Sequence, residues 1–410
     1  MTAKSKTTNP GPLNGVRILD MTTVLMGPYA TLILADLGAD ILKVESPEGD
    51  ISRQSTPART PGMGHAFLNG NRNKRSVALN LKKPEGREAL LALAKTVDVF
   101  LYNVRQQAMK RLKLAYEDLS AVNPQIIYVG GIGFSSRGRY GGRAAYDDVI
   151  QGMAGVPWMA AKASGQIPRY APNAYADRVS SLHIANAITA ALYYRKCTGK
   201  GQRVDVPMYE NMVHLLLGEH LEGETFIPAR GPMGHPRALA PDRRPYRTKD
   251  GHMCTLVYND RQWRTFFALI GQPEKFDQDQ RFSSQINRIK NIDAVYGFLS
   301  EVLQTRTTAE WTKLFLEHDL PVGPMQSLDD VLNDPHLADT GYYSVVEHPT
   351  EGTLRAMCYP TEFSETPVSN RRPAPLLGEH TAELLAEAGY DQARIDELLA
   401  KGAALAPRRA

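Results

Sequence analysis

The chain has 410 residues, which at roughly 100 to 200 residues per domain allows about two to four domains. Apolar residues make up 42% and charged residues 22% of the sequence, a balance that supports a packed core and excludes a disordered chain. The 48 basic and 44 acidic residues are interspersed and leave a formal net charge of +4. This small excess argues against a nucleic-acid-binding protein and is compatible with an anionic small ligand.

Cysteine, histidine and hydropathy patterns exclude further classes. Cys197, Cys254 and Cys358 form no CxxC pair, so we expect no disulfide scaffold and a reducing, cytoplasmic location. The ten histidines show no HxxxH or HExxH spacing, so we expect no metal site. No segment approaches the roughly 18 unbroken apolar residues of a membrane span. The polar start lacks the apolar core of a signal peptide, and residues 1–12 are expected to form a flexible tail.

The first ordered segment is expected to form a β-α-β unit. Apolar strands are predicted at 16–19 and 41–44, and the residues between them at 29–37 carry apolar side chains at helical spacing. Pro28 stands near the start of this helix and Gly38 just past its end, which are the preferred positions of these two residues. Two parallel strands joined by a helix in about 30 residues are typical of a doubly wound α/β domain.

The apolar pattern predicts further helices and strands along the chain. In the first half we expect a helix at 87–95, a strand at 97–102, a short helix at 117–122, a strand at 126–131, a helix at 146–153, a loop rich in Pro, Gly and Ser at 155–172, a long helix at 179–195 and a strand at 203–207. Residues 227–245 are expected to form a linker. A second compact unit follows, with a strand at 253–258, helices at 263–270 and 292–304 and a return at 321–325, and the C-terminal part holds helices at 383–387 and 394–399.

The turn after the first strand argues against a nicotinamide cofactor. Its sequence, TTVLMGP, has one glycine and lacks the GxGxxG pattern that lets a backbone approach a pyrophosphate. Glu45 ends the second strand as a ribose-binding acid would, but alone it is more typical of a solvated strand end.

Several short motifs, each weak alone, occur together in a specific order. They are GVRILD at 15–20, Gly27-Pro28, LGADILKVE at 37–45, NKRS at 73–76, NLK at 80–82, Asn103, AYD at 145–147, Ala176-Asp177, TGKGQ at 198–202 before the strand VDV, and PLLGEH at 375–380. Spread over nearly the whole chain, these motifs resemble the class III CoA-transferases of the CaiB/BaiF type. That family includes formyl-CoA:oxalate and carnitine CoA-transferases and the α-methylacyl-CoA racemases.

The resemblance implies an α/β fold with a large Rossmann-like, doubly wound domain and a smaller α/β domain. Residues 13–225 would form the first part of the large domain, with the CoA site and the nucleophile. Residues 226–324 would form the small domain with its linkers, and residues 325–410 would return to the large domain. The resemblance also implies a homodimer of two interlocked chains.

The resemblance assigns the nucleophile to Asp177. In the transferases of this family, an aspartate at the matching position attacks an acyl-CoA thioester, forms an acyl-aspartyl anhydride and releases CoA. A carboxylate suits this step because its anhydride is about as reactive as the thioester, and covalent catalysis splits a difficult exchange into easier steps. Judged by its sequence position alone, Asp177 also fits a helix N-cap. The resemblance implies no permanently bound cofactor, since CoA, acyl-CoA and a small carboxylic acid are all substrates.

CoA carries a pyrophosphate and a 3′-phosphate, so basic groups and helix amides are expected at its site. The resemblance assigns CoA contacts to Val24, Leu25, Ser46, Asn73, Lys74, Arg75, Asn103, Val104, Arg111 and Asp147. Ser46 stands where formyl-CoA transferases have an arginine, so we expect Arg53 or Arg72 to meet that phosphate instead. The glycine-rich loop that shields the intermediate in formyl-CoA transferases has no clear counterpart, and Arg178 is expected to hold a substrate carboxylate or to pair with a surface acid.

Residue 146 separates the transferases from the racemases. Racemisation needs two opposed acid/base groups, and the racemases supply a histidine just before the acid that matches Asp147. This chain has Tyr146, whose hydroxyl titrates near ~10 and is a poor base at neutral pH. We therefore predict a CoA-transferase in which Asp177, Tyr146 and Asn103 are catalytic, with Tyr146 orienting the acyl group or the carboxylate. An acyl-CoA racemase or isomerase and a catalytically silent CoA-binding protein stay open as alternatives.

Overall fold

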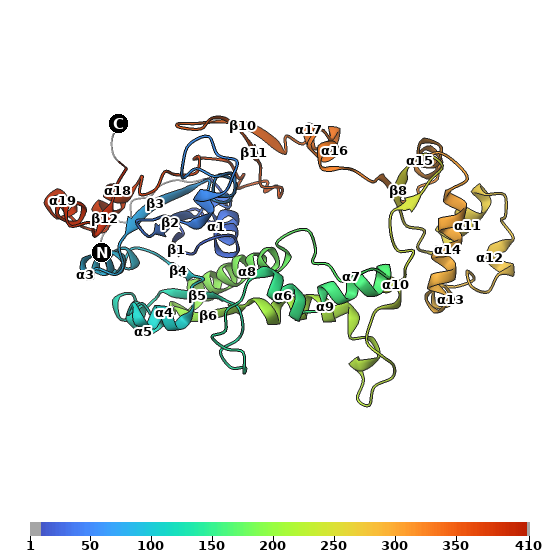
Figure 1. Ribbon diagram of the computed structural model, residues 1–410, viewed down its shortest axis with the longest axis horizontal. Helices are drawn as coiled ribbons and strands as arrows, with labels where there is room; N and C mark the ends of the chain where they lie inside the picture. Colours follow the sequence, from blue (N-terminus) through green and yellow to red (C-terminus); the bar gives the residue numbers. More distant parts are fainter. Residues whose placement is uncertain (1–9, 408–410) are drawn as a thin grey trace. The chain divides into compact units, whose positions relative to one another are not determined.

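The computed structural model describes residues 10–407 and divides into two compact units (Figure 1). Unit 1 comprises the residues up to Ala154, Pro172–Val213 and the residues from Pro335 on, and unit 2 comprises Gly155–Ala171 and His214–Asp334. The boundaries therefore differ from the expected 226 and 324, and residues 155–171 group with the second unit. Residues 1–9 of the expected tail lie outside the described part, whereas Gly11 is buried against Leu37.

Unit 1 alternates strands and helices in its first half. Its elements there are β1 (Arg17–Met21), α1 (Met26–Asp36), β2 (Asp40–Glu45), α2 (His65–Gly70), β3 (Lys74–Leu79), α3 (Pro84–Ala94), β4 (Val99–Tyr102), α4 (Gln106–Arg111), α5 (Tyr116–Val122), β5 (Ile127–Ile132), α6 (Asp147–Met153), α8 (Tyr175–Thr198) and β6 (Gln202–Pro207), with a 3-10 turn at Ile51–Gln54. The C-terminal part adds α17 (Pro335–Asp339), β10 (Tyr343–His348), β11 (Gly352–Met357), α18 (Thr381–Glu387), α19 (Gln392–Ala400) and β12 (Ala404–Leu405). Helix α9 (Met208–His220) leads from unit 1 into unit 2.

The strands of unit 1 form one seven-stranded sheet in the order β12-β3-β2-β1-β4-β5-β6. All neighbours are parallel except β12, which pairs antiparallel with β3. The chain moves outward from β1 through β2 to β3 and then crosses to β4 on the other side of β1. The strand order thus reverses between β1 and β4, and in such sheets ligands bind beyond the carboxyl ends of the strands at this switch point. The expected mixed α/β fold with a parallel sheet is therefore present.

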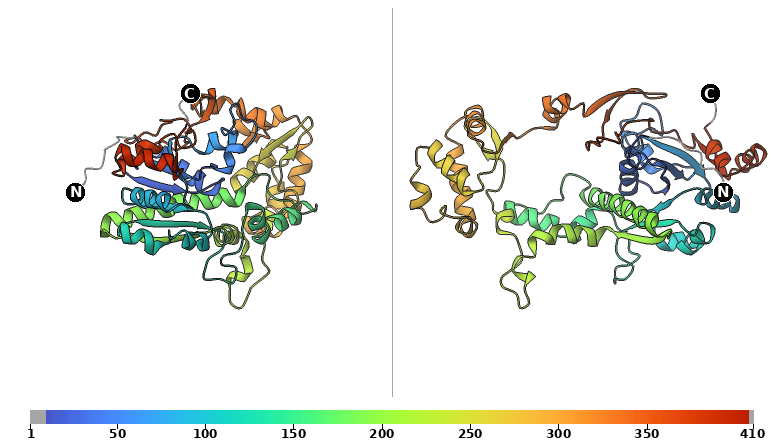
Figure 2. Two further views of the ribbon diagram at one scale, coloured as in Figure 1. Left: turned by 60° about the vertical axis from the view of Figure 1, so that its left-hand side comes forward. Right: turned by 180° about the vertical axis from the view of Figure 1, so that it is seen from behind.

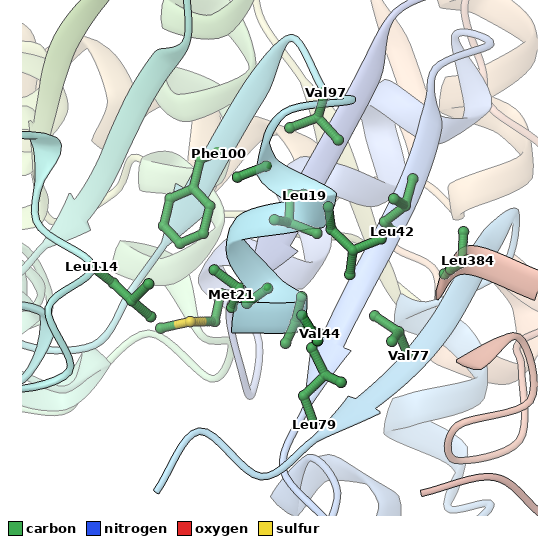
Figure 3. Packing of buried hydrophobic residues seen from close by; sticks show 14 of the residues in the cluster. Leu19, Met21, Leu42, Val44, Val77, Leu79, Val97, Phe100, Leu114 and Leu384 are labelled. Carbon is green, nitrogen blue, oxygen red and sulfur yellow. The ribbon is translucent and has the colours of Figure 1, made fainter. Parts of the chain in front are cut away.

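One face of the sheet is apolar. Leu19, Leu42 and Phe100 occupy matching positions on adjacent strands and pack with Val77 (Figure 3). Helices α3, α5, α18 and α19 supply the opposing apolar side chains of this core. Because side chains alternate across a strand, the residues between these apolar positions point to the other face, toward α1 and α8.

The other face carries a buried layer of charges. Asp20 accepts hydrogen bonds from the hydroxyl groups of Thr22 and Thr31 and lies 3.5 Å from the Lys74 ammonium. Lys43 donates to Asp50 at 2.9 Å, and all four charged side chains of these two pairs are fully buried. Burial lowers the pKa of Lys74 to about 7, with Asp20 opposing that shift. Each of these buried charges on the face covered by α1 therefore has an oppositely charged partner.

Helix α8 and the segment before it differ from expectation. The helix begins at Tyr175 and ends at Thr198, so Asp177 lies inside its first turn and is not its N-cap. Part of the expected loop at 155–172 is helix α7 (Val156–Ser164), since a proline in the first turn of a helix is tolerated and Gly155 and Gly165 flank it with positive φ angles.

Unit 2 is mostly helical around an aromatic core. Its elements are α7, α10 (Pro236–Leu239), β7 (Tyr246–Arg247), β8 (His252–Thr255), α11 (Asp260–Leu269), α12 (Lys275–Gln278), α13 (Gln285–Lys290), α14 (Ile292–Leu303), α15 (Thr308–Glu317), β9 (Val322–Pro324) and α16 (Leu328–Leu332), with a 3-10 turn at Glu222–Thr225. Trp263, Phe266, Phe282 and Trp311 pack at its centre. The three short strands pair antiparallel in the order β7-β8-β9.

The C-terminal segment of unit 1 packs against the first part of the chain. Helix α18 contacts β3 and α3, so the red and blue ends of the chain lie side by side (Figure 2). Arg75 on β3 donates to Asp40, Glu383 and Glu387, and its side chain is 3% exposed. This guanidinium therefore joins two distant parts of the sequence.

Two further observations concern helix length and the cysteines. No helix among residues 10–407 is long and apolar enough to cross a membrane. The three cysteines are free thiols.

We expect Arg75→Met to lower the stability of the protein. The variant removes the buried cation that Asp40 and Glu387 share with Arg17 and that links β3 to α18, which should cost about 2–3 kcal/mol in the free energy of unfolding, measured by urea titration. Arg394→Gln, which removes exposed ion pairs with Glu397 and Glu88, is the matched control and should leave the free energy of unfolding unchanged. An Arg75 variant of normal stability with a raised KM for acyl-CoA would contradict the structural role.

Candidate active site

The larger cavity of unit 1, about 590 Å3 in volume, lies at the switch point of the sheet. The turns after β1, β4 and β5 all contribute to its wall, as expected where the carboxyl ends of parallel strands meet. It is lined by three segments and two single residues, namely Thr23–Met26, Asn103–Gln107 with Lys110, most of the residues from Gly131 to Tyr146, Asp177 on α8 and Met208 on α9. Five of the predicted site residues therefore meet here with the predicted nucleophile. They are Val24, Leu25, Asn103, Val104 and Tyr146.

Asn103 holds the two turns of the switch point together. Its side-chain carbonyl accepts from the N–H of Thr23 at 3.0 Å, and its amide nitrogen donates to the carbonyl of Thr23 at 2.8 Å. Both polar groups of the Asn103 side chain therefore bond to the backbone of one residue, Thr23, in the neighbouring turn. Asn103 therefore fixes the shape of the cavity floor.

Val24 adopts a strained backbone conformation in the cavity wall. Its φ angle of 70° lies in the left-handed region, which β-branched residues rarely occupy. The N–H of Val24 donates to the Asp50 carboxylate at 3.1 Å, and Asp50 is held in turn by Lys43. Burial alone would raise the pKa of Asp50. The Lys43 ammonium and nearby N–H donors outweigh that effect and hold this pKa below its ordinary value. The buried ion pair thus stabilises the strained turn.

Asp177 reaches the cavity from the first turn of α8. Its backbone N–H donates to the Asp147 carboxylate at 3.0 Å, and the other oxygen of that carboxylate accepts from Gln151 at 2.6 Å. The N-cap residue of α8, Ala174, makes no side-chain capping bond. Asp147 from α6 therefore satisfies an N–H of the first turn of α8 that has no partner within the helix.

The environment of Asp177 weakens the acidity of its carboxyl group. Burial and, after it, the negative charge of Asp147 raise the pKa of Asp177 to about 6, while Arg178 acts in the opposite direction. The guanidinium of Arg178 stacks on the ring of Tyr29 with its carbon 3.9 Å from the ring centre, and Arg178 is not among the cavity-lining residues. A carboxylate near this pKa is mostly ionised at neutral pH yet poorly solvated, as a nucleophile requires.

The segment between β5 and α6 forms a wall that the sequence reading did not assign to the site. Gly131, Gly133, Gly138, Gly141 and Gly142 all line the cavity. A Cβ atom at Gly133 would lie 2.3 Å from the Cβ of Ala145, so only glycine fits at that approach. The sequence does carry a signal for this wall, because residues 130–142 are rich in glycine. Glycine-rich segments let a backbone approach a ligand closely.

The basic side chains of the cavity also differ from those predicted. Arg105, Lys110 and Arg143 line it, whereas Arg111, which ends α4, is exposed elsewhere. The helical pattern of α4 could have distinguished Lys110 from Arg111, since adjacent residues of a helix face different directions.

The NKRS motif does not reach the cavity. Asn73 bonds to Asp36 and to the backbone of residues 369–372, and Lys74 and Arg75 are buried in the ion pairs described above. We therefore withdraw these three residues as CoA contacts, because their side chains are already used inside the protein.

Other predicted phosphate contacts are also placed elsewhere. Arg53 donates to Glu45 at 2.7 Å and stacks on Phe67, so it is not free for a phosphate. Arg72 pairs with Asp36. Ser46 is exposed just after β2, along the same edge of the sheet as the cavity. Asp147 lies behind Asp177 and not in the cavity wall, and Tyr146 lines the wall with a side chain that is 75% exposed.

Among the described residues, no group of three His, Cys, Asp or Glu side chains is arranged to hold a metal ion. The chemistry of the cavity thus centres on one carboxylate, Asp177, with amide and basic groups around it.

Comparison with known proteins matches this chain to one family. The family model of CoA-transferase family III matches residues 13–381. The chain is 32% identical to human succinyl-CoA:glutarate CoA-transferase (Homo sapiens), over 97% of this chain and 91% of that protein. It is 34% identical to succinyl-CoA:mesaconate CoA-transferase of Haloarcula marismortui, over 93% of this chain and 97% of that protein. The crystal structure of a CaiB/BaiF family protein from Brucella suis matches with a TM-score of 0.76 and 30% identity, over 92% of this chain and 100% of that one. The chain therefore belongs to CoA-transferase family III and is a CoA-transferase of the CaiB/BaiF type.

Proposed function

We propose that this enzyme moves CoA from an acyl-CoA to a carboxylic acid through covalent intermediates on Asp177. The observation that carries the proposal is the position of this carboxylate. It lies in the wall of a cavity at the switch point of the sheet and is poorly solvated, and within residues 10–407 no hydrogen-bond donor stabilises its charged form.

The proposed reaction conserves charge at every step. A carboxylate oxygen of Asp177 attacks the thioester carbon, the C–S bond breaks, and an acyl-aspartyl anhydride and CoA thiolate result. The thiolate attacks the aspartyl carbonyl and releases the donor acid. The acceptor carboxylate then displaces the thiolate from the aspartyl thioester to form a second anhydride. The thiolate finally takes the new acyl group and restores Asp177.

The surroundings of Asp177 fit this sequence of steps. The first turn of α8 carries the positive end of the helix dipole, which favours the oxyanions that form beside it. The Asp147 carboxylate fixes the backbone of Asp177 and, by its charge, makes the nucleophile more basic. Asp147 thereby acts as a positioning residue.

We propose that CoA runs along the carboxyl edge of the sheet. Val24, Leu25, Asn103 and Val104 would contact its pantetheine arm, and Arg105 and Lys110 would meet its phosphates. Support comes from their shared cavity and from the exposure of both basic residues. Ser46, on the same edge, would lie nearer the adenosine end.

We propose dicarboxylic acids as the substrate class. The succinyl-CoA:glutarate and succinyl-CoA:mesaconate transferases are similar to this chain over nearly its whole length. A dicarboxylate keeps one carboxylate free while the other reacts, and Arg143 in the cavity wall offers that group a charged partner.

We also propose a homodimer. Helix α8 exposes Leu182 and Tyr193, at 57% and 71%, and about 11 residues make three helical turns, so both lie on one face. Val149 and Met153 on α6 add further exposed apolar surface. Such apolar surface on unit 1 is typical of a protein interface.

The transferase proposal predicts that Asp177→Asn abolishes CoA exchange, by at least about a thousandfold in kcat. The assay follows CoA esters by chromatography, with succinyl-CoA and a panel of mono- and dicarboxylic acids, and wild type should prefer dicarboxylates. Hydroxylamine should trap an acylated Asp177 in the wild type only.

The stability of the Asp177→Asn variant follows from the pKa of Asp177, which burial raises to about 6 in the folded protein. In the unfolded chain an aspartate titrates near about 4. Below about pH 4 the carboxyl group is neutral in both states and has no effect, whereas above about pH 6 it is ionised in both states and its burial destabilises the folded state. The Asn variant should therefore be more stable at pH 8, by at most about 3 kcal/mol, and its thermal midpoint, measured alongside, separates lost chemistry from unfolding.

Two results would contradict the transferase proposal. Deuterium exchange at the α-carbon of an acyl-CoA without acceptor acid would indicate a racemase. Binding of CoA with no exchange for any acid, and no trapped acyl group, would indicate a silent CoA-binding protein.

The pH profile should respond to the neighbours of Asp177 in opposite directions. Since the nucleophile must be ionised, kcat/KM should fall as the pH drops below about 6. Asp147→Asn removes a negative charge, lowers the pKa of Asp177 and should move this acid limb to lower pH. Arg178→Gln removes a positive charge and should move it to higher pH. Asp148→Asn, an exposed acid on the same helix as Asp147, is the control and should leave the limb in place. Shifts in the same direction for Asp147 and Arg178 variants would refute the electrostatic account.

The dimer proposal predicts a sedimentation mass of twice 45.3 kDa for the wild type. Leu182→Glu with Tyr193→Glu places two charges on the proposed interface and should yield monomers. Ile286→Glu, at a residue of unit 2 that is 66% exposed, is the control. A monomeric wild type, or a dimeric double variant, would show that α8 is not the interface.

A further inference from the structure

A second cavity of unit 1 lies away from the active site. Its volume is about 190 Å3, and it is bounded by α2, the β10–β11 hairpin and residues 370–374. Arg72 precedes β3, and Arg371 donates to the carbonyl groups of Ala35 and Ala39, before the start of β2. The cavity therefore lies near the amino ends of β2 and β3, whereas the active-site cavity lies beyond the carboxyl ends of the strands.

Four arginines line this small cavity. They are Arg72, Arg355, Arg371 and Arg372, and Glu347 is the one carboxylate among the lining residues. Glu347 already accepts a hydrogen bond from Thr353 at 2.8 Å. The cavity therefore carries a net positive charge, even when the Asp36 carboxylate that pairs with Arg72 is included.

Arg72 and Arg371 are held in place by one end of each guanidinium. Nη2 of Arg72 donates to Asp36, and Nη2 of Arg371 donates to Ala35 and Ala39. The Nε atom of each is buried and has no hydrogen-bond partner among the described residues. A buried donor without a partner is costly, so both guanidinium groups keep unused hydrogen-bonding capacity beside the cavity.

His348 does not supply that acceptor. Its Nε2 is 2.9 Å from the carbonyl of Ala374, and its Nδ1 accepts from the N–H groups of Thr350 and Glu351. Both ring nitrogens are thus used by the backbone, and the arginines remain the only side chains of the cavity that carry unused charged donors in the described part of the chain.

We propose that this cavity binds a small oxyanion of the phosphate type. Guanidinium groups match the oxygens of phosphate in geometry and charge. The cavity is smaller than the roughly 300 Å3 at which pockets for drug-sized ligands begin, which favours the ion or the phosphate end of an ester over a whole cofactor. Arg72 and Arg371 form the fixed side of the site, and the exposed Arg355 and Arg372 close over the anion from the rim. The site is independent of the transferase reaction proposed above.

The test measures the thermal midpoint and calorimetric binding of the full-length protein with inorganic phosphate, at ionic strength balanced with sodium chloride. Saturating CoA is present in a parallel series, so that phosphate bound in the active-site cavity is displaced. We expect saturable binding that persists with CoA. A phosphate monoester run alongside distinguishes the free ion from the end of an ester.

Two variants locate the binding. Arg355→Ala with Arg372→Ala changes exposed residues and should fold normally, and Arg371→Met removes a fixed donor. Each should weaken phosphate binding by at least about tenfold, the effect of losing a charge-assisted hydrogen bond. Arg288→Met is the matched control, since its Nε is likewise buried without a partner but belongs to unit 2. It should leave phosphate affinity unchanged.

Three results would overturn the proposal. They are no saturable binding, binding that CoA abolishes, and binding that all variants retain, which would indicate an adventitious ion only. If Arg371→Met does not fold, the rim variant alone decides between these outcomes.

Discussion

The candidate active site depends on one contact, the hydrogen bond from the backbone of Asp177 to the Asp147 carboxylate. It completes the first turn of α8 from a different helix and brings two acidic side chains close together. Burial first, and then the proximity of Asp147, raise the pKa of Asp177, and the positive charge of Arg178 offsets part of that rise. A single arrangement therefore fixes the position of the carboxylate and adjusts its basicity.

The rest of the site is built by turns that the sheet brings together. Reversal of the strand order between β1 and β4 leaves a gap, and Asn103 closes it by bonding both ways to Thr23. Beneath that turn, the Lys43–Asp50 pair supports the strained backbone of Val24. The charges buried under α1 thus have a purpose besides stability, because they shape the wall against which a ligand lies.

Much of the fold and part of the site could be predicted from the sequence. Alternating apolar strands and the helices between them mark β1, α1 and β2 because burial on both faces leaves a strong pattern. Family motifs assign Asp177, Asn103 and Val24, and all three line the same cavity. Lys74 and Arg75 were misassigned because a motif does not reveal which way a strand side chain points, and both face inward. The glycine-lined wall and Arg105 were missed because their role arises from turns that only the folded sheet brings together.

The edge strand β12 has a consequence for how the protein is made. The outermost position of the sheet is filled by residues 404–405, and Arg75 finds two of its carboxylates at 383 and 387. During synthesis, β3 therefore has a bare edge, and Arg75 has Asp40 but neither glutamate as a partner, until residues 383–405 have emerged. Completion of the sheet is thus coupled to the arrival of residues 404–405, so a chain released before them cannot form its seventh strand.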